Sequence, residues 1–441
     1  MVSSITSHRG LLVQVIYLSG MNIYFSGIGG VGIGPLAKIA HDAGHTIVGS
    51  DVTEGLVTRE LRADGIEVEI GQDGRFLEAF HKQAPIDWFV YTSALPRDHP
   101  ELTLATSLGI RTSKRDEFLA YFLEEHNFKL IAVSGTHGKT TTTGMLVWVM
   151  KQLGIPVSYS VGSTLTFGPS GAYDPESDYF VYECDEYDRN FLHFTPHLSL
   201  VTSVDYDHPD TYPTKNDYTQ AFTQFLASSD HVILWNKDAE YLALQPNDQL
   251  WILEDGDVPP LKLTGQHNRQ NGQLVLKALE YLRISGEGSP EEALAQFPGT
   301  DRRFERLADN LYSDYGHHPV EIAATLELAR ELSDNIMLVY QPHQNQRQHL
   351  VKHLYTDVFE GAQSIYWLPT YLSREDPAQT ILSPETLTAT VTNRDAVHYA
   401  DLDDALWDTI QKARERGVLV LCMGAGTIDD WVREKLASAT A

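Results

Sequence analysis

Short apolar runs alternate along the chain with longer stretches in which apolar residues keep a helical spacing. Residues 22–26, 130–133, 179–182 and 231–236 are dominated by apolar side chains, as expected of strands buried on both faces of a parallel sheet. Residues 145–153 instead repeat apolar positions at intervals of three and four, as in an amphipathic helix. This alternation predicts the α/β class, in which helices cover parallel sheets.

The alternation continues through three successive α/β units. We predict domains at residues 21–126, 127–298 and 299–441, with a charged break before the second and a Gly- and Ser-rich break before the third. The first and third domains are expected to be Rossmann-like, and the central one to be of the P-loop ATPase type. Within the third domain, the pattern predicts a strand at 336–340 and a helix around 349–359.

A glycine turn connects the strand at 130–133 to the helix that follows. Its sequence is Gly135-Thr-His-Gly138-Lys139-Thr140, and the two glycines allow several backbone N–H groups to point inward. The helix N-terminus and Lys139 add positive potential, so the turn suits a polyphosphate, with Thr140 offering a hydroxyl to Mg²⁺. Val133 occupies the position of the first glycine in the usual G-x-x-x-x-G-K-[ST] motif. A plain strand–helix connection is the alternative, which the Lys-Thr pair disfavours.

A second glycine turn follows the first strand of the chain. Gly27-Ile-Gly29-Gly30 lies between the strand at 22–26 and a helix predicted from Pro35 to Ala43, and Asp51 follows about twenty residues on. In outline this is the dinucleotide-binding fingerprint. A nicotinamide oxidoreductase is therefore one hypothesis, although it gives no role to the Lys139 turn.

Acidic residues follow two strands of the central domain. Glu183 begins the sequence Glu-Cys-Asp-Glu-Tyr-Asp after one strand, and His208 follows another. Ligands of open α/β sheets bind at the carboxyl ends of the strands, so both should face the same crevice as the Lys139 turn. Mg²⁺ prefers oxygen ligands, which fits Glu183 better than the imidazole of His208. A solvated acidic turn is the alternative.

Two residue pairs in the third domain are candidates for phosphate or substrate contacts. Arg302 and Arg303 are either solvated surface charges or cations that neutralise a transferring phosphoryl group. His317 and His318 are adjacent, so they do not converge easily on one metal ion. A structural or substrate-positioning role is the better interpretation of the histidine pair.

The composition narrows the possible classes of protein. The 441 residues carry a formal net charge of −27, which disfavours binding to nucleic acid or to anionic membranes. Two cysteines, Cys184 and Cys422, leave no disulfide framework and indicate a reducing compartment, the cytoplasm. We expect small-molecule substrates and a monomer or homodimer. Residues 11–18 weakly resemble a signal peptide, but residues 1–20 are better explained as a dispensable extension or misplaced start.

Taken in order, the motifs of the chain resemble those of the Mur ligase family. The similarity runs from about residue 21 to the C-terminus. It rests on Gly27-Ile-Gly-Gly, Gly49-Ser-Asp51, Gly135-Thr-His-Gly-Lys-Thr-Thr-Thr-Thr143, Glu183-x-Asp-Glu-x-Asp188, Asp207-His, Gly265-x-His-Asn-x-x-Asn271, Arg302-Arg-Phe-Glu305, Asp314-Tyr-Gly-His-His-Pro319, Gln341-Pro-His343 and Met423-Gly-Ala-Gly426.

The resemblance implies three domains that bind a UDP-sugar, Mg-ATP and an incoming amino acid, in that order. It implies an ATP-dependent ligase in peptidoglycan precursor synthesis, which activates the lactyl carboxylate of UDP-N-acetylmuramate as an acyl phosphate and joins it to an amino acid. The motifs Arg302-Arg-Phe-Glu and Asp314-Tyr-Gly-His-His-Pro favour the branch of the family that adds L-alanine. The sister branch that recycles murein tripeptide is an alternative, favoured by the Glu183 motif and Phe167-Gly. A catalytically silent nucleotide-binding homologue is a further alternative.

The resemblance also assigns roles to individual residues. The catalytic group comprises Lys139, Glu183, His208 and Arg303. The metal ligands are Thr140, Glu183 and His208. The nucleotide would contact Gly135, Thr136, His137, Gly138, Lys139, Thr140, Thr141, Asn268 (adenine), Arg302 and Asp314 (ribose). The UDP-sugar would contact Gly27, Gly29, Gly30, Asp51 and Ser93. The acceptor amino acid would contact Tyr315, His317, His343 and Arg347.

The chain departs from the family pattern at one position near the acceptor. The family usually continues Gln-Pro-His with an arginine and a second arginine three residues later. Here Gln344 replaces the first arginine and Arg347 keeps the second. Because these arginines are expected to hold the carboxylate of the acceptor, the departure leaves the identity of the amino acid open.

Overall fold

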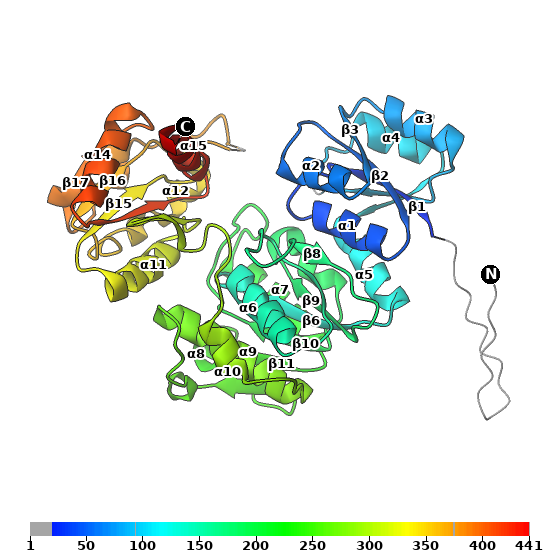
Figure 1. The fold of residues 1–441 in the computed structure, drawn as a ribbon, viewed down its shortest axis with the longest axis horizontal. Helices are drawn as coiled ribbons and strands as arrows, with labels where there is room; N and C mark the ends of the chain where they lie inside the picture. Colours follow the sequence, from blue (N-terminus) through cyan, green and yellow to red (C-terminus); the bar gives the residue numbers. More distant parts are fainter. Residues whose placement is uncertain (1–19, 93, 374, 441) are drawn as a thin grey trace.

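The computed structural model describes residues 20–92, 94–373 and 375–440, and it has three α/β lobes in chain order (Figure 1). We call them the N-terminal, central and C-terminal lobes, and each is built around its own sheet. The three-domain α/β fold predicted from the sequence is thereby confirmed. Ser93 and the predicted N-terminal extension up to residue 19 lie outside the described residues.

The N-terminal lobe is a five-stranded parallel sheet with helices on its faces. Its strand order is β3-β2-β1-β4-β5, in which the first strand of the chain is central. That position explains the apolar run at its start, since the sheet is covered on both sides. Its elements are β1 (Asn22–Ser26), α1 (Gly34–Asp42), β2 (Thr46–Asp51), α2 (Leu56–Ala63), β3 (Glu67–Ile70), α3 (Arg75–Gln83), β4 (Trp88–Tyr91), α4 (Pro100–Ser107), β5 (Arg111–Lys114) and α5 (Arg115–Glu125).

The central lobe is a seven-stranded sheet of order β12-β11-β10-β6-β9-β7-β8. All its pairings are parallel except that of β7 with β8. Its regular elements are β6 (Lys129–Ser134), α6 (Lys139–Gln152), β7 (Ser158–Ser160), β8 (Gly171–Ala172), β9 (Tyr179–Glu183), the 3₁₀ helix η1 (Tyr187–His193), β10 (Leu198–Val201), α7 (Lys215–Ala227), β11 (Val232–Trp235), α8 (Asn236–Tyr241), β12 (Leu250–Leu253), the 3₁₀ helix η2 (Asp255–Asp257), α9 (Gln266–Leu282) and α10 (Pro290–Ala295).

The C-terminal lobe is a six-stranded sheet of order β13-β14-β18-β15-β16-β17, in which β13 and β14 form an antiparallel hairpin. Its elements are β13 (Glu305–Ala308), β14 (Leu311–Asp314), α11 (Pro319–Leu332), β15 (Ile336–Tyr340), α12 (Asn345–Val351), the 3₁₀ helix η3 (Lys352–Leu354), β16 (Ser364–Trp367), α13 (Pro384–Leu387), the 3₁₀ helix η4 (Arg394–Ala396), β17 (Val397–Tyr399), α14 (Asp404–Glu415), β18 (Leu419–Met423) and α15 (Ile428–Thr440).

The helix predicted around residues 349–359 is wrong in its extent. α12 ends at Val351, and after η3 the chain continues as turns. Val351, Tyr355 and Phe359 are all buried, so their spacing of four does report burial. The hydroxyl of Tyr355 is buried and hydrogen-bonds with Tyr340 and Gln348, so tertiary contacts rather than a continuous helix fix the position of this side chain.

The lobes meet so that the carboxyl ends of the central strands face a shared cleft. α1 of the N-terminal lobe packs on β8, and α11 of the C-terminal lobe packs on α9 (Figure 1). The central lobe therefore contacts both neighbours, and residues from all three lobes line one cavity. Across the described part of the chain, none of the helices combines the length and apolar character that a membrane span requires.

Candidate functional site

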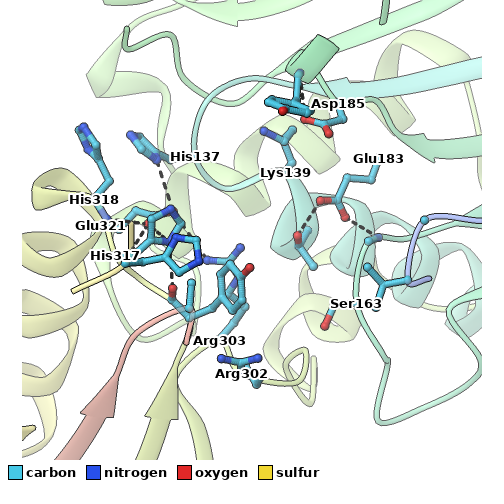
Figure 2. Close-up of a pocket in the computed structure, with 18 of the residues that line it drawn as sticks. His137, Lys139, Ser163, Glu183, Asp185, Arg302, Arg303, His317, His318 and Glu321 are labelled. Atoms are coloured by element: carbon cyan, nitrogen blue, oxygen red, sulfur yellow. Dashed lines mark hydrogen bonds and ion pairs between the residues drawn. The ribbon is translucent and has the colours of Figure 1, made fainter. Parts of the chain in front are cut away.

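A cavity of about 960 Å³ extends between the three lobes. It receives Val31 and Gly32 from the N-terminal lobe, the lysine turn and acidic strand ends from the central lobe, and Arg302 and Arg303 from the C-terminal lobe. Figure 2 shows how the charged side chains converge on this space. Most of the residues assigned from the sequence to phosphate, metal and acceptor are thus brought together.

The turn between β6 and α6 has the geometry of a phosphate-binding loop. Gly135 has a φ of 136°, and a Cβ there would lie 2.7 Å from the carbonyl oxygen of Ser203, so only glycine fits. Gly138, at a φ of 85°, is the N-cap of α6. The hydroxyl of Thr136 donates to the Asp205 carbonyl, 2.8 Å away, and ties the turn to the chain after β10. The turn is therefore held in place, and the first N–H groups of α6, which have no partner within the helix, are available to bind an anion.

Lys139 lies at the centre of this arrangement and is paired with a carboxylate that the sequence did not single out. Its ammonium donates to Glu186 Oε2 at 2.7 Å and to the Gly135 carbonyl at 2.6 Å. Burial disfavours the charged ammonium, but the carboxylates of Glu186 and Asp185 outweigh it and hold the pKa of Lys139 above its ordinary value. Lys139 is accordingly a permanent cation beside the loop.

Two of the predicted metal ligands are in direct contact. The hydroxyl of Thr140 donates to Glu183 Oε1 at 2.7 Å, and the amide of Gly162 donates to Glu183 Oε2 at the same distance. A Cβ on Gly162 would lie 2.9 Å from the Glu183 carboxylate, so a side chain at this position would displace that carboxylate. This hydroxyl–carboxylate pair faces the cavity at the end of β9 (Figure 2).

The third predicted ligand, His208, belongs to a separate group that contains Glu186, the partner of Lys139. Asp185, Glu186 and His208 offer ligand atoms that lie within 4.8 Å of one another. His208 has a φ of 56°, a left-handed conformation that is unusual for histidine and marks a constrained position. Burial raises the pKa of Glu186, although the Lys139 ammonium opposes this. The site thus has two acidic groups, and Lys139 pairs with the one that contains Glu186.

Tyr315 organises the predicted arginine pair. The guanidinium carbons of Arg302 and Arg303 lie 4.7 and 5.3 Å from the centre of its ring. Arg302 donates to the Gly424 carbonyl at 3.0 Å, while Arg303 Nη1 lies 3.7 Å from Glu321 Oε1, an oxygen that is also close to His137 of the loop. The two arginines therefore have different surroundings, and Arg303 is the one nearer the loop.

Glu321, which sequence reasoning missed, connects the C-terminal lobe to the phosphate loop. Its Oε1 lies 3.4 Å from His137 Nδ1 and 3.7 Å from Arg303 Nη1, and its Oε2 accepts the amides of His317 and His318. Burial by itself lowers the pKa of His137, but Glu321 and Asp205 raise it above its ordinary value, which favours the imidazolium. The available signal was the capping box His318-x-x-Glu321 at the start of α11.

The predicted acceptor residues line the same cavity. Arg347 pairs with Asp207 at 3.4 Å, and the ring of His343 stacks on Tyr371 at a centroid distance of 5.6 Å. Burial lowers the pKa of His317 to about 3, so this histidine is a neutral polar group. Gln344 lines the cavity with a φ of 58°. The departure from the family pattern is therefore in the wall of the site.

The residues assigned to adenosine line a second, smaller cavity of about 370 Å³. Thr141, Asn268 and Asp314 border it together with apolar side chains of α11 such as Leu328. Both oxygens of Asp314 already accept backbone amides, from Phe304 and Gly316, and burial raises its pKa to about 6. His137, Arg303 and Glu321 line both cavities and so mark the boundary between them.

The N-terminal glycine turn reaches the large cavity with its last residues only. Val31 and Gly32 line the cavity, whereas Gly27, Gly29, Gly30 and Asp51 are not among its lining residues. The amide of Gly29 donates to Asp51 Oδ2 at 2.8 Å, so Asp51 holds the turn in shape.

Sequence reasoning missed Arg115, a cation that lies beside the N-terminal glycine turn. Arg115 lies directly against Gly32, where a Cβ would collide with its guanidinium, and it lines the large cavity. Its position at the carboxyl end of β5, where ligands of parallel sheets bind, was the available signal.

Comparisons with known proteins agree with this arrangement. Three family models match in order: Mur ligase family, catalytic domain, over residues 22–127; Mur ligase middle domain, over 133–251; and Mur ligase, glutamate ligase domain, over 302–426. A UDP-N-acetylmuramate–L-alanine ligase from Nocardioides sp. is 30% identical and covers 92% of this chain and 93% of its own length.

Two solved structures share the fold. The UDP-N-acetylmuramate–alanine ligase of Thermotoga maritima has a TM-score of 0.74 at 23% identity, over 95% of this chain and 99% of its own. A murein peptide ligase of Psychrobacter arcticus has a TM-score of 0.64 at 23% identity, over 95% and 98%. Because matches in sequence and in fold both extend over nearly the whole chain, the protein belongs to the Mur ligase family, as its motifs predicted.

Proposed function

We propose that this protein is an ATP-dependent ligase that joins L-alanine to the lactyl carboxylate of UDP-N-acetylmuramate in peptidoglycan precursor synthesis. One observation carries the proposal: a phosphate loop with its lysine, two acidic groups and an arginine pair all face one cavity between three lobes. The name of the Nocardioides relative supports the choice of substrates. We propose domain boundaries at 21–126 for the UDP-sugar, 127–298 for ATP and 299–441 for the amino acid.

The residues of the cavity fit Mg²⁺, which would neutralise charge on the transferring phosphoryl group. Thr140 and Glu183 form one oxygen-rich group, and Asp185, Glu186 and His208 form another. Carboxylate and hydroxyl oxygens beside a phosphate loop are the donors that Mg²⁺ takes in nucleotide sites.

The side chains of the chain itself suggest how the reaction is accelerated. A carboxylate oxygen of the sugar nucleotide attacks the γ-phosphorus of ATP, and ADP leaves. Lys139 and Arg303 carry positive charge to the two sides of the transferring group, which stabilises the charge on its oxygens. The amine of alanine then attacks the acyl phosphate, and phosphate leaves with the former carboxylate oxygen. Residues from the three lobes position the substrates and exclude water from the acyl phosphate.

The acceptor is the part of the proposal that the chain leaves most open. A murein tripeptide is the alternative, and the fold shared with the Psychrobacter peptide ligase is compatible with it. The partly buried Arg347, already paired with Asp207, offers a single guanidinium where family members have two. We therefore expect a small α-amino acid with a weaker affinity for its carboxylate than in enzymes that keep both arginines.

Phosphate release tests the proposal directly. Purified protein is supplied with Mg-ATP and UDP-N-acetylmuramate, together with alanine, glycine, serine or the tripeptide in separate reactions. Alanine is expected to give the highest kcat/KM. Preference for the tripeptide would move the protein to the recycling branch, and ATP binding without phosphate release from any mixture would identify a catalytically silent homologue.

Glu321 gives a prediction about positioning. Glu321→Gln keeps the size of the side chain but removes the charge that holds His137 and Arg303. We expect kcat to fall by about tenfold, because misplaced catalytic cations lose part of their effect, while KM for UDP-N-acetylmuramate stays unchanged. Steady-state kinetics measure both constants, and Glu327→Gln, on the same helix, is the matched control. A raised KM for the sugar with an unchanged kcat would contradict this role.

His208 gives a prediction about metal dependence. His208→Ala should raise the Mg²⁺ concentration needed for half-maximal rate by about tenfold, because one member of the second acidic group is lost. His197→Ala serves as control, since this histidine pairs with Asp230 at the surface. Rates are measured over a series of Mg²⁺ concentrations at saturating ATP. The same Mg²⁺ requirement in both variants would exclude His208 from the metal site.

A further inference from the structure

A second group of potential metal ligands lies in the N-terminal lobe, outside the large cavity. His45 immediately precedes β2, Glu125 is the last residue of α5, and His126 is its C-cap. Their ligand atoms lie within 4.8 Å of one another. None of the three lines either cavity, and they lie at the amino end of the sheet, whereas the glycine turn lies at its carboxyl end.

Two polar side-chain atoms of this group are buried without a partner among the described residues. Glu125 Oε2 and His126 Nε2 have neither solvent contact nor a hydrogen bond. Buried polar atoms are nearly always satisfied, so two exceptions on adjacent residues of one such group need an explanation such as an ion.

The surroundings of His126 resemble those of a metal-binding histidine. Its Nδ1 lies 3.3 Å from the hydroxyl of Tyr173, so a proton on Nδ1 leaves the Nε2 lone pair free. The rings of Phe122 and Tyr173 lie 4.3 and 5.3 Å from its ring and cover part of it. Nδ1 of His45 accepts the amide of Met21 at 3.1 Å. A neutral imidazole has a single nitrogen lone pair. When a metal binds His45, the metal–nitrogen bond therefore replaces the hydrogen bond from the Met21 amide.

We propose that His45, Glu125 and His126 form a binding site for a transition-metal dication, with Zn²⁺ as the best match. Two imidazoles and one carboxylate, with water in the fourth position, are a donor set that suits Zn²⁺. The chain passes from His126 through Asn127 to β6, and Tyr173 belongs to the central lobe. Figure 1 shows α5 between the two lobes. The bound ion therefore fixes the end of α5 where the N-terminal lobe joins the central lobe.

The proposal is tested by titrating ZnCl₂ into full-length protein that has been freed of metal with a chelator, in buffer with saturating Mg²⁺. Calorimetry should show one equivalent of Zn²⁺ in the wild type. His126→Ala and the isosteric Glu125→Gln should each weaken this binding by at least about tenfold. His353→Ala, an exposed histidine of η3, and His208→Ala in the large cavity should retain it.

Thermal unfolding provides the second readout. Zn²⁺ should raise Tm of the wild type and of the two control variants but not that of Glu125→Gln, because only a folded site binds the ion. Equal Tm values without metal show that Glu125→Gln is folded. Wild-type Zn²⁺ affinity in His126→Ala and Glu125→Gln, no Zn²⁺ binding at all, or loss of the equivalent in His208→Ala would each overturn the proposal.

Discussion

Replacement of Lys139 by alanine is expected to lower kcat by about 10³-fold, which is the size of effect seen when one group that stabilises the transition state is removed. Lys139 pairs with Glu186 of the second acidic group, and it stands at the N-terminus of α6, where the phosphates would lie. Phosphate release measures kcat, and calorimetry measures the affinity for UDP-N-acetylmuramate, which should be nearly unchanged. An unchanged rate would refute the role given to Lys139.

Loss of folding must be separated from loss of catalysis in this variant. Lys139→Ala leaves Glu186 buried beside His208 without its main partner, and removing one member of a buried pair costs about 3–5 kcal/mol. The double variant Lys139→Ala/Glu186→Gln removes that unpaired charge and should recover Tm without recovering kcat. Lys151→Ala, at the other end of α6, is the matched control and should keep the wild-type rate.

Replacement of Arg303 by alanine is expected to lower kcat by about 10²-fold, because Arg303 borders both cavities beside the phosphate loop. Arg302→Ala should act mainly on KM for ATP, since Arg302 is directed to Gly424 and Asp429. Arg303→Lys should restore little of the rate, because an ammonium does not reproduce the planar fork of a guanidinium. Equal losses of kcat in Arg302→Ala and Arg303→Ala would contradict the division between the two arginines.

The fold was predictable because strands that are buried on both faces of a parallel sheet appear in the sequence as continuous apolar runs. The predicted strands at 22–26 and 336–340 match β1 and β15 residue by residue. Gly154, which has a φ of 70° just beyond α6, ends that helix as a glycine would be expected to. The β13–β14 hairpin escaped prediction, because an edge strand with exposed residues such as Arg306 lacks an apolar run.

The candidate site was predictable where its residues are close in sequence to a glycine turn or a strand end. Lys139, Thr140 and Glu183 were found in this way, and the structure places them in one cavity. Within the acidic turn, the sequence could not tell that Glu186 would pair with Lys139, because this depends on how the chain curls after β9. The contact of His137 with Glu321 depends on how two lobes meet, which local patterns do not encode.

The central claim is that a carboxylate of the sugar nucleotide becomes an acyl phosphate at the expense of ATP. UDP-N-acetylmuramate labelled with ¹⁸O in its lactyl carboxylate, incubated with the protein, Mg-ATP and L-alanine, tests this most directly by mass spectrometry of the released phosphate. The account predicts one ¹⁸O atom in each phosphate and one amide product for each ATP consumed. Phosphate that is released without ¹⁸O, or without amide product, would contradict it.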